Sequence, residues 1–303
     1  MTRALVLMTT YNGAKYVNQQ IDSILAQTGV DITLYILDDK SSDNTFERLQ
    51  EIAANNNNIQ VFQNELNAGV PAINFFALME KVTNPDLFEF YAFADQDDCW
   101  LPQKLEQSIK KCVENQADLY ASGLRLWDGE KEFGFQAKDK PQKQFDYLFQ
   151  SASAGCTYTM NAKLFTLISN IIRGVDFKSW KYFSHDWFVY FIARHHQCKV
   201  FIDRESYILY RIHANNNFGL VDITKPSSIF KRLSFLNDHW YRNHLEKMLP
   251  FMSPISTDYT IVDTIISKYF FARIKLLLSH GSQLRREFSY NSILNLLILF
   301  NRI

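Results

Sequence analysis

The stretch from Phe90 to Trp100 constrains this chain more than any other. It begins with five uncharged residues, Phe-Tyr-Ala-Phe-Ala, a pattern typical of a strand buried within a sheet. Three aspartates, Asp95, Asp97 and Asp98, follow within four positions. In open α/β sheets, ligands bind outside the carboxyl ends of the strands. The stretch therefore predicts a buried strand that carries three carboxylates to a binding edge.

The three carboxylates repel one another, and each has a raised pKa unless a cation neutralises them. Mg²⁺ and Mn²⁺ suit such a site, because they take one or two carboxylates together with the phosphates of a substrate. The alternative interpretation is a solvated acidic turn that caps a helix beginning near Pro102. This stretch alone leaves both interpretations open.

The first 115 residues alternate short apolar segments with amphipathic ones. Strands are expected at 4–8, 32–37, 59–63 and 90–94, and helices at 14–26, 44–54 and 72–81. This alternation predicts an α/β fold with a mostly parallel sheet and helices on both of its faces.

Polar residues follow three of these strands, and parallel strands bring their carboxyl ends to one edge. The residues are Thr9, Tyr11, Asp38, Asp39, Asp95 and Asp97. The chain has neither GxGxxG after its first strand nor a GxxxxGK[ST] segment, so no dinucleotide site or P-loop is supported. A nucleotide could instead be held by the Tyr11 ring, by carboxylates on its base and ribose, and by a metal on its diphosphate.

The net charge of the chain is zero but unevenly distributed. Residues 223–303 hold eleven Lys or Arg and five Asp or Glu, a net charge of +6. Helical patterns are expected there at about 227–249, 259–278 and 289–302. Such basic amphipathic helices can lie on an anionic membrane, form a dimer interface or pack on the rest of the chain. We favour membrane association or self-association; nucleic acid is the weakest option, because no reading motif is present.

The sequence also indicates in which cellular compartment the protein is expected. Its four cysteines lack the spacing of a zinc site or a disulfide framework, which favours a reducing cytoplasm. A strand is expected within a few residues of the first, so we expect no signal peptide. The longest apolar run, 293–300, is far shorter than the ~20 residues that span a bilayer.

Four segments together carry a family resemblance. They are TTYNG at 9–13, LDDKSSDNT at 37–45, NAG at 67–69 and DQDDxWxP at 95–102. In this order and rough spacing, the chain from Ala4 to Gly219 resembles a family-2 glycosyltransferase of the GT-A fold. Its second half is most similar to bacterial rhamnosyltransferases that build cell-surface polysaccharide.

The resemblance implies a division of the chain and of its nucleotide site. Residues 1–222 would form the catalytic domain, with a nucleotide-sugar half at 1–115 and an acceptor half at 116–222, and 223–303 a helical C-terminal region. By position, the base would be held by Thr9, Tyr11 and Asp39, the ribose would lie by Asp95 and Gln96, and the metal would bind Asp97. Lys40 departs from the family, which usually has Gly there, and is expected to change the loop.

The second half contains weaker signals. A strand is expected over 119–127, and the charged segment 129–142 is expected to be a mobile loop. The segment 154–157, with Gly155 and Cys156, resembles the family's acceptor side; a buried strand with a tight bend at Gly155 explains it equally. We interpret His195 and His196 as surface helix residues.

The sequence Ser184-His185-Asp186-Trp187 opens an apolar helix over 188–193. From the residues alone, Ser184 or Asp186 is simply an N-cap. The resemblance instead makes Asp186 the general base that deprotonates the acceptor hydroxyl, with His185 and Trp187 on the acceptor side. A carboxylate at a helix N-terminus stays ionised, which suits that role.

A last segment, YRIHANNNFG at 210–219, resembles the family's YRxHxxN loop. It makes His213 a candidate third metal ligand or diphosphate contact, and Arg211 a source of positive charge beside the diphosphate. A structural histidine is the alternative.

These features together predict an inverting, metal-dependent glycosyltransferase. Its donor would be a nucleotide-diphospho-sugar, by resemblance dTDP-L-rhamnose, and its acceptor a lipid-linked glycan at the inner face of the bacterial membrane. One alternative is the same fold with a UDP-hexose or UDP-N-acetylhexosamine donor. The other is a non-catalytic subunit that binds sugar nucleotides.

Overall fold

The computed structural model describes residues 1–65, 67–180, 183–213, 240–267 and 269–303. Its centre is a seven-stranded sheet of order β10-β6-β9-β4-β1-β2-β3. All neighbouring strands in it are parallel except β9, which runs antiparallel to β4 and β6. The strands are β1 (Thr2–Thr10), β2 (Val30–Asp38), β3 (Ile59–Gln63), β4 (Phe90–Ala94), β6 (Leu119–Ser122), β9 (Thr159–Asn161) and β10 (Val200–Asp203).

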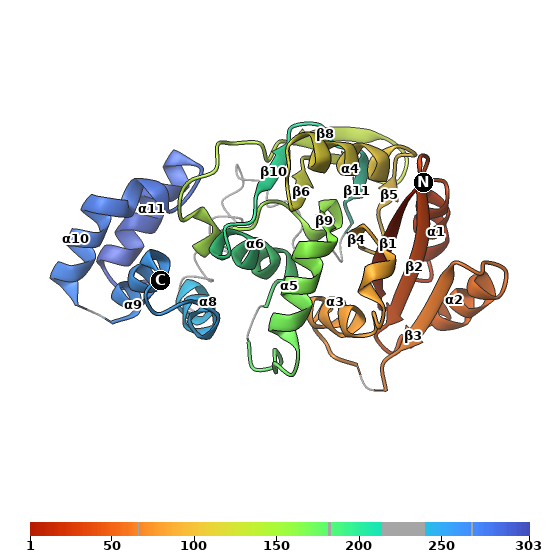
Figure 1. Ribbon diagram of the computed structural model, residues 1–303, viewed down its shortest axis with the longest axis horizontal. Helices are drawn as coiled ribbons and strands as arrows, with labels where there is room; N and C mark the ends of the chain where they lie inside the picture. The colour runs from red at the N-terminus through yellow and green to blue at the C-terminus, as the bar shows by residue number, and fades with distance from the viewer. Residues whose placement is uncertain (66, 181–182, 214–239, 268) are drawn as a thin grey trace.

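Helices cover both faces of this sheet, as the alternating pattern predicts (Figure 1). Alternate residues of β1 point to opposite faces, because successive side chains of a strand do so. Leu5 and Leu7 join the core under α3 (Pro71–Glu80), α5 (Ala162–Ile172) and α6 (His185–His195). Val6 and Met8 join the core under the other group of helices. That group is α1 (Val17–Leu25), α2 (Thr45–Ala54) and α4 (Lys104–Glu114).

A second, four-stranded sheet corrects two expectations. Its order is β5-β11-β7-β8. The single strand expected over 119–127 divides at Gly123 into β6 and β7, which belong to different sheets; a Cβ at Gly123 would lie 2.6 Å from the Phe135 ring. Within the expected loop 129–142 lies strand β8, which pairs with β7. The bounds are β5 (Cys99–Trp100), β7 (Leu124–Trp127), β8 (Glu132–Gln136) and β11 (Ile208–Arg211).

Strand β8 was not predicted because most of its side chains are exposed. Phe133 and Phe135 are each 49% exposed, and the strand shows no buried face. Two hydrogen bonds from the Arg125 guanidinium to the Glu132 carboxylate, at 2.8 and 2.7 Å, join it to β7. Pairing across strands, rather than a hydrophobic pattern, defines this element.

The C-terminal region is helical, as expected. Its helices are α8 (Trp240–Met248), α9 (Thr257–Ile266), α10 (Phe270–His280) and α11 (Phe288–Leu299). Across the described residues, the short 3₁₀ turns are η1 (Pro85–Leu87), η2 (Asp146–Leu148), η3 (Gly155–Thr157), η4 (Leu249–Phe251) and η5 (Gly281–Gln283). The helix expected over 259–278 is therefore two helices, because the chain is extended at Tyr269. The first part of the helix expected over 227–249, and the proposed boundary at 222, lie outside the described residues.

These helices share a core with the rest of the chain. Leu245, Ile261 and Ile298 belong to the same buried cluster as residues of α3, α5 and α6. No helix in the described ranges is long and apolar enough to cross a membrane.

His195 corrects a further expectation, because it is not a surface residue. Its Nδ1 lies 2.6 Å from Asp258 Oδ2 on α9, and both side chains are buried. The Tyr147 hydroxyl donates to the same oxygen at 2.8 Å. Burial alone would raise the pKa of Asp258, but hydrogen bonds from His195, Ser256 and Tyr147 lower it to about 2. Asp258 therefore anchors the C-terminal helices to α6.

We expect Asp258→Ala to lower the free energy of unfolding by about 2–4 kcal/mol, because it leaves His195 and the Tyr147 hydroxyl without their partner in a buried place. Thermal and urea unfolding measure the loss. Asp263→Ala, an exposed position on the same helix, is the control and should stay within about 0.5 kcal/mol of the parent protein. Equal losses in the two variants would contradict the anchoring role.

Candidate active site

The candidate site lies at the carboxyl ends of β1, β2 and β4, which are neighbours in the sheet. The registers pair Thr10 of β1 with Asp38 of β2, and Met8 of β1 with Ala94 of β4. Each strand therefore ends at about the same level. The polar residues that follow them meet along one edge, as the sequence predicts.

The carboxylates of Asp95, Asp97, Asp98 and Asp186 form one electrostatic cluster. Burial, followed by the nearby carboxylates of Asp97 and Asp186, raises the pKa of Asp95 to about 7. Burial, then Asp97 and Asp95, raises the pKa of Asp98 well above its usual range. Asp186 lies in the first turn of α6, about 90 residues from Asp95 in sequence. The fold thus brings the predicted base to the predicted nucleotide site.

Asp97 meets His213 at this edge. Asp97 Oδ2 and His213 Nε2 lie 2.7 Å apart, and the His213 ring stacks on Tyr16 at 5.2 Å between centroids. An oxygen and an imidazole nitrogen that converge in this way fit the ligand set that the sequence predicts for a divalent cation.

Arg211 supports the Asp97–Asp98 turn from behind. Its backbone N–H donates to Asp98 Oδ1 at 3.0 Å, and its Nε donates to the carbonyl of Asp97 at 2.6 Å. The side chain is buried and its guanidinium lies 4.2 Å from the centre of the Trp127 ring. The Arg211 guanidinium therefore stabilises the Asp97–Asp98 turn. A contact with the diphosphate stays a prediction.

Asp98 and Cys156 form a second group of possible ligands behind Asp97. In the described part of the chain, Asp95, Asp98 and Cys156 offer ligand atoms that all lie within 4.8 Å of one another. Asp98 Oδ2 is buried and has no hydrogen-bond partner among the described residues. Burial, then Asp98 and Asp95, raises the pKa of the Cys156 thiol. Asp98 is one of the three carboxylates expected at this edge, but the family resemblance assigns it no individual role.

Lys104 is a buried basic residue of the site that was not predicted from the sequence. It begins α4, is 3% exposed, and its Nζ lies 3.5 Å from the centre of the Trp100 ring. Burial lowers its pKa to about 7, while Cys156 and Asp98 act in the opposite direction. Its place two residues after Pro102 in a helix start is the only signal in the sequence.

These groups fit a divalent cation. The unpartnered Asp98 oxygen and the raised pKa values of Asp95 and Asp98 indicate uncompensated negative charge. Carboxylate oxygens suit Mn²⁺ and Mg²⁺, whereas the His213 imidazole and the Cys156 sulfur are softer donors.

On the nucleotide side, Gln96 holds the Tyr11 backbone. Gln96 Oε1 accepts from the Tyr11 N–H at 2.8 Å, and Gln96 Nε2 donates to the Tyr11 carbonyl at 3.0 Å. A Cβ at Gly13 would lie 2.2 Å from the same Oε1, so glycine lets the loop close on Gln96. The Tyr11 ring remains 47% exposed, and Thr9 beside it is buried. Their contacts with a base, and that of Gln96 with a ribose, stay predictions.

Asp39 is engaged by the 67–69 turn. Its carboxylate accepts from the Ala68 N–H at 2.8 Å and from Asn64 Nδ2 at 2.7 Å. Lys40 next to it has a φ of 59°, in the left-handed region that favours glycine. The loop thus keeps a glycine-like conformation despite the lysine, at a cost of about 1–2 kcal/mol.

In the segment predicted to lie on the acceptor side, Gly155 makes room for the His185 ring. A Cβ at Gly155 would lie 2.1 Å from His185 Nε2, and the His185 ring stacks on Phe75 at 4.1 Å between centroids. Gly155 begins η3, so neither a strand nor a simple bend describes this segment. Burial lowers the pKa of His185 to about 4, against the opposing effect of Asp186.

Asp186 and Trp187 point to different surroundings. Asp186 Oδ1 accepts from the Ser184 hydroxyl and, at 2.7 Å, from the Trp187 N–H. Trp187 is 3% exposed, donates its indole N–H to the Tyr147 carbonyl at 2.6 Å and stacks on His244 of α8. It packs against the C-terminal region. Its role beside an acceptor stays a prediction.

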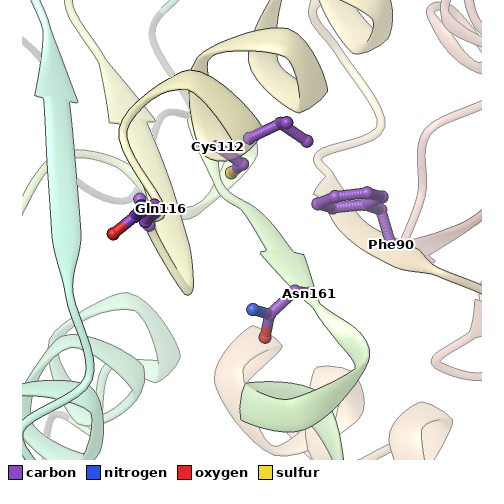
Figure 2. A pocket seen from close by; sticks show the side chains of 6 residues that line it. Phe90, Cys112, Gln116 and Asn161 are labelled. Carbon is purple, nitrogen blue, oxygen red and sulfur yellow. The ribbon is translucent and has the colours of Figure 1, made fainter.

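A hollow of about 240 Å³ lies away from this site. Figure 2 shows Phe90, Cys112, Gln116 and Asn161 around it. Phe90 begins β4, whereas the carboxylate cluster follows the other end of that strand. The hollow is therefore unrelated to the candidate site.

Comparison with known proteins gives the family. The model for "Glycosyl transferase family 2" matches residues 5–171. The chain is 31% identical over 293 residues to the "dTDP-rhamnosyl transferase RfbG" of Shigella flexneri, which covers 96% of this chain and 99% of that relative. The chain therefore belongs to glycosyl transferase family 2. The predicted resemblance to bacterial rhamnosyltransferases is confirmed.

Two further comparisons bear on the fold and on the range of relatives. The chain is 29% identical to the "UDP-Glc:alpha-D-GlcNAc-diphosphoundecaprenol beta-1,3-glucosyltransferase WfgD" of Escherichia coli. That match covers 50% of this chain and 56% of the relative. The S. aureus TarS 1–349 structure in complex with UDP-GlcNAc aligns at a TM-score of 0.59 and 16% identity, over 100% of this chain and 82% of that one. The expected α/β GT-A fold with C-terminal helices is confirmed.

The partly buried His185, whose ring is kept neutral, makes stability depend on pH. The unfolded chain protonates it near pH 6.5, but the folded protein does so only near pH 4. Its contribution is complete above pH 6.5 and is lost as the pH falls towards 4, by up to about 3 kcal/mol. Urea unfolding at pH 7 and pH 5 should show this loss, and His185→Gln should reduce it. An unchanged pH dependence in the variant would contradict the burial of a neutral ring.

Proposed function

We propose that this family-2 glycosyltransferase is an inverting, metal-dependent enzyme that transfers a sugar from a nucleotide-diphospho-sugar to a lipid-linked glycan. The observation that carries the proposal is the proximity of Asp186, at the start of α6, to the Asp95–Asp97 segment at the end of β4. The proposed base, the proposed nucleotide-binding edge and the candidate cation ligands would thus lie together.

In the proposed reaction, the Asp186 carboxylate accepts the proton of the acceptor hydroxyl as its oxygen attacks C1 of the sugar. The new C1–O bond forms as the bond from C1 to the diphosphate oxygen breaks, and the nucleoside diphosphate leaves with the electron pair. Asp97 and His213 would hold a Mg²⁺ or Mn²⁺ ion, which offsets the charge on the leaving diphosphate. Gly155, Cys156 and His185 line the acceptor side.

For the donor, we propose dTDP-L-rhamnose. The support is the similarity over nearly the whole chain to a relative whose name states dTDP-rhamnosyl transfer. A UDP-hexose or UDP-N-acetylhexosamine is the second candidate, favoured by the relative named for UDP-Glc and by the UDP-GlcNAc complex of TarS. A thermal-shift series with these donors and Mn²⁺ separates the two.

Two substitutions separate the proposed roles of base and metal ligand. Asp186→Asn should retain donor binding and lower turnover by about 10²–10⁴-fold, because the proton acceptor is lost. Asp97→Ala should abolish turnover and also the stabilisation by Mn²⁺. Titration calorimetry with the nucleoside diphosphate and a transfer assay measure both effects, with the exposed Asp31→Ala as control. Wild-type turnover in Asp97→Ala would refute the metal assignment, and loss of donor binding in Asp186→Asn would refute the base.

For the C-terminal region, we propose that it docks on the anionic inner face of the bacterial membrane, where a lipid-linked acceptor would lie. On α10, Phe271 and Leu278 are 83% and 85% exposed, and the exposed Lys275 lies between them at helical spacing. Leu296 on α11 and Phe300, which directly follows that helix, are 57% and 64% exposed. Exposed apolar rings next to basic residues, within a region of net charge +6, suit anionic lipid.

Replacement of Phe271 and Leu278 by Glu should abolish co-sedimentation with vesicles that contain phosphatidylglycerol, because two apolar contacts become repulsive charges. Val113→Glu, on an exposed apolar residue of α4, is the control and should sediment like the parent protein. No binding of the parent protein to such vesicles, with a dimer in solution that the double variant dissociates, would contradict the membrane and favour a second copy.

A further inference from the structure

Arg286, just before α11, reaches from the C-terminal region into the catalytic part of the chain. Its side chain is 8% exposed. Nη1 donates to the carbonyls of Lys138 and Ala152 at 3.2 Å each, and Nη2 donates to the carbonyl of Ser151. The Arg286 guanidinium therefore binds three backbone carbonyls in a segment that pairs with no strand of either sheet.

Asp146 fixes the guanidinium in this place. Arg286 Nε lies 3.3 Å from Asp146 Oδ2, and Asp146 is completely buried. Arg194 Nη1 pairs with the other oxygen, Oδ1, at 3.1 Å, and the Tyr190 hydroxyl donates to it at 2.8 Å. Because hydrogen bonds from a charged donor are stronger than those between neutral groups, Arg286 holds the 151–152 segment firmly.

Tyr158 connects that segment to α6. Its hydroxyl oxygen accepts from the N–H groups of Ala152 and Ser153 at 3.1 and 3.4 Å, and its O–H donates to the carbonyl of Asp186 at 3.2 Å. Tyr158 is fully buried, so these partners are the ones that satisfy its hydroxyl. A continuous chain of contacts runs from Arg286 through Ala152 and Tyr158 to Asp186.

A second observation links the two ends of this chain directly. Lys138, whose carbonyl Arg286 holds, has its ammonium within electrostatic range of Arg286, Asp186 and Glu287. Burial, then Arg286, lowers the pKa of Lys138, and Asp186 and Glu287 act in the opposite direction. The C-terminal region thus contributes charge at the edge where Asp186 lies.

We propose that Arg286 is a positioning residue for Asp186, so that the C-terminal region completes the acceptor side of the active site. The inference rests on the proposed function, because it takes Asp186 to be the base. It also gives the C-terminal helices a role in catalysis that is independent of any membrane contact.

The test uses Arg286→Met in the full chain, with Arg286→Lys as the conservative variant. A displacement of the base by a fraction of an ångström costs on the order of tenfold to a hundredfold in kcat, while KM for the donor and the affinity for the nucleoside diphosphate stay within threefold. Arg286→Lys should recover part of kcat. Arg285→Met is the matched control, because Arg285 is next in sequence but donates to the Tyr241 hydroxyl on α8. It should keep the parent kcat.

Tyr158→Phe provides a second route if Arg286→Met folds poorly, because it removes one hydroxyl and keeps the ring. If the two residues act through one chain of contacts, the double variant Arg286→Met/Tyr158→Phe loses no more kcat than the worse single variant. Multiplied losses would overturn the inference, and so would a parental kcat in Arg286→Met or a loss of donor binding that matches the loss of kcat.

Hydrogen exchange tests the same inference without activity. In Arg286→Met, exchange at the amides of Ala152 and Ser153 should accelerate by more than tenfold relative to the parent protein, and in Arg285→Met it should not. If the parent protein transfers no sugar from any donor, the proposed function fails, while this measurement still decides whether Arg286 orders the segment. Unchanged exchange would overturn the positioning role.

Discussion

Crowding of carboxylates at the end of β4 is the constraint on which the rest of the structure depends. Asp95, Asp97, Asp98 and Asp186 repel one another in a place where burial already disfavours charge, as the raised pKa values of Asp95 and Asp98 indicate. Two basic side chains offset part of this repulsion: Lys104, on which Asp98 acts electrostatically, and Arg211, which donates to the Asp97 carbonyl. In the proposed reaction, a divalent cation would offset the remaining negative charge and join this edge to the diphosphate.

The fold could be predicted well where hydrophobic period and burial coincide. The strands at β1, β2, β3 and β4 are apolar because both faces are covered, and the polar residues after them lie at one edge as the parallel topology requires. Strand β8 could not be predicted, since it is exposed and held by pairing with β7. The division of 119–127 depends on the Phe135 ring against Gly123, a contact distant in sequence.

The candidate site was predicted in its first half and less completely in its second. The structure brings together Asp97 and His213, which lie 116 positions apart in two different motifs; their role as metal ligands stays a prediction. The contacts that Gln96, Arg211 and Trp187 make within the protein were not expected, because a residue type gives the chemistry of a side chain but not its partner. Gly155 illustrates the limit, since only the position of the His185 ring explains why a glycine is required there. The C-terminal region likewise joins the site through Arg286, beyond the segment that the family model matches.

The central claim is that a divalent cation joins this carboxylate edge to a nucleoside diphosphate. Titration calorimetry of the parent protein with dTDP and with UDP, in Mn²⁺ and then in excess chelator, tests it most directly. The account predicts that binding of the preferred nucleotide depends on Mn²⁺ and weakens at least tenfold in chelator. Equal affinity with and without the metal would contradict it.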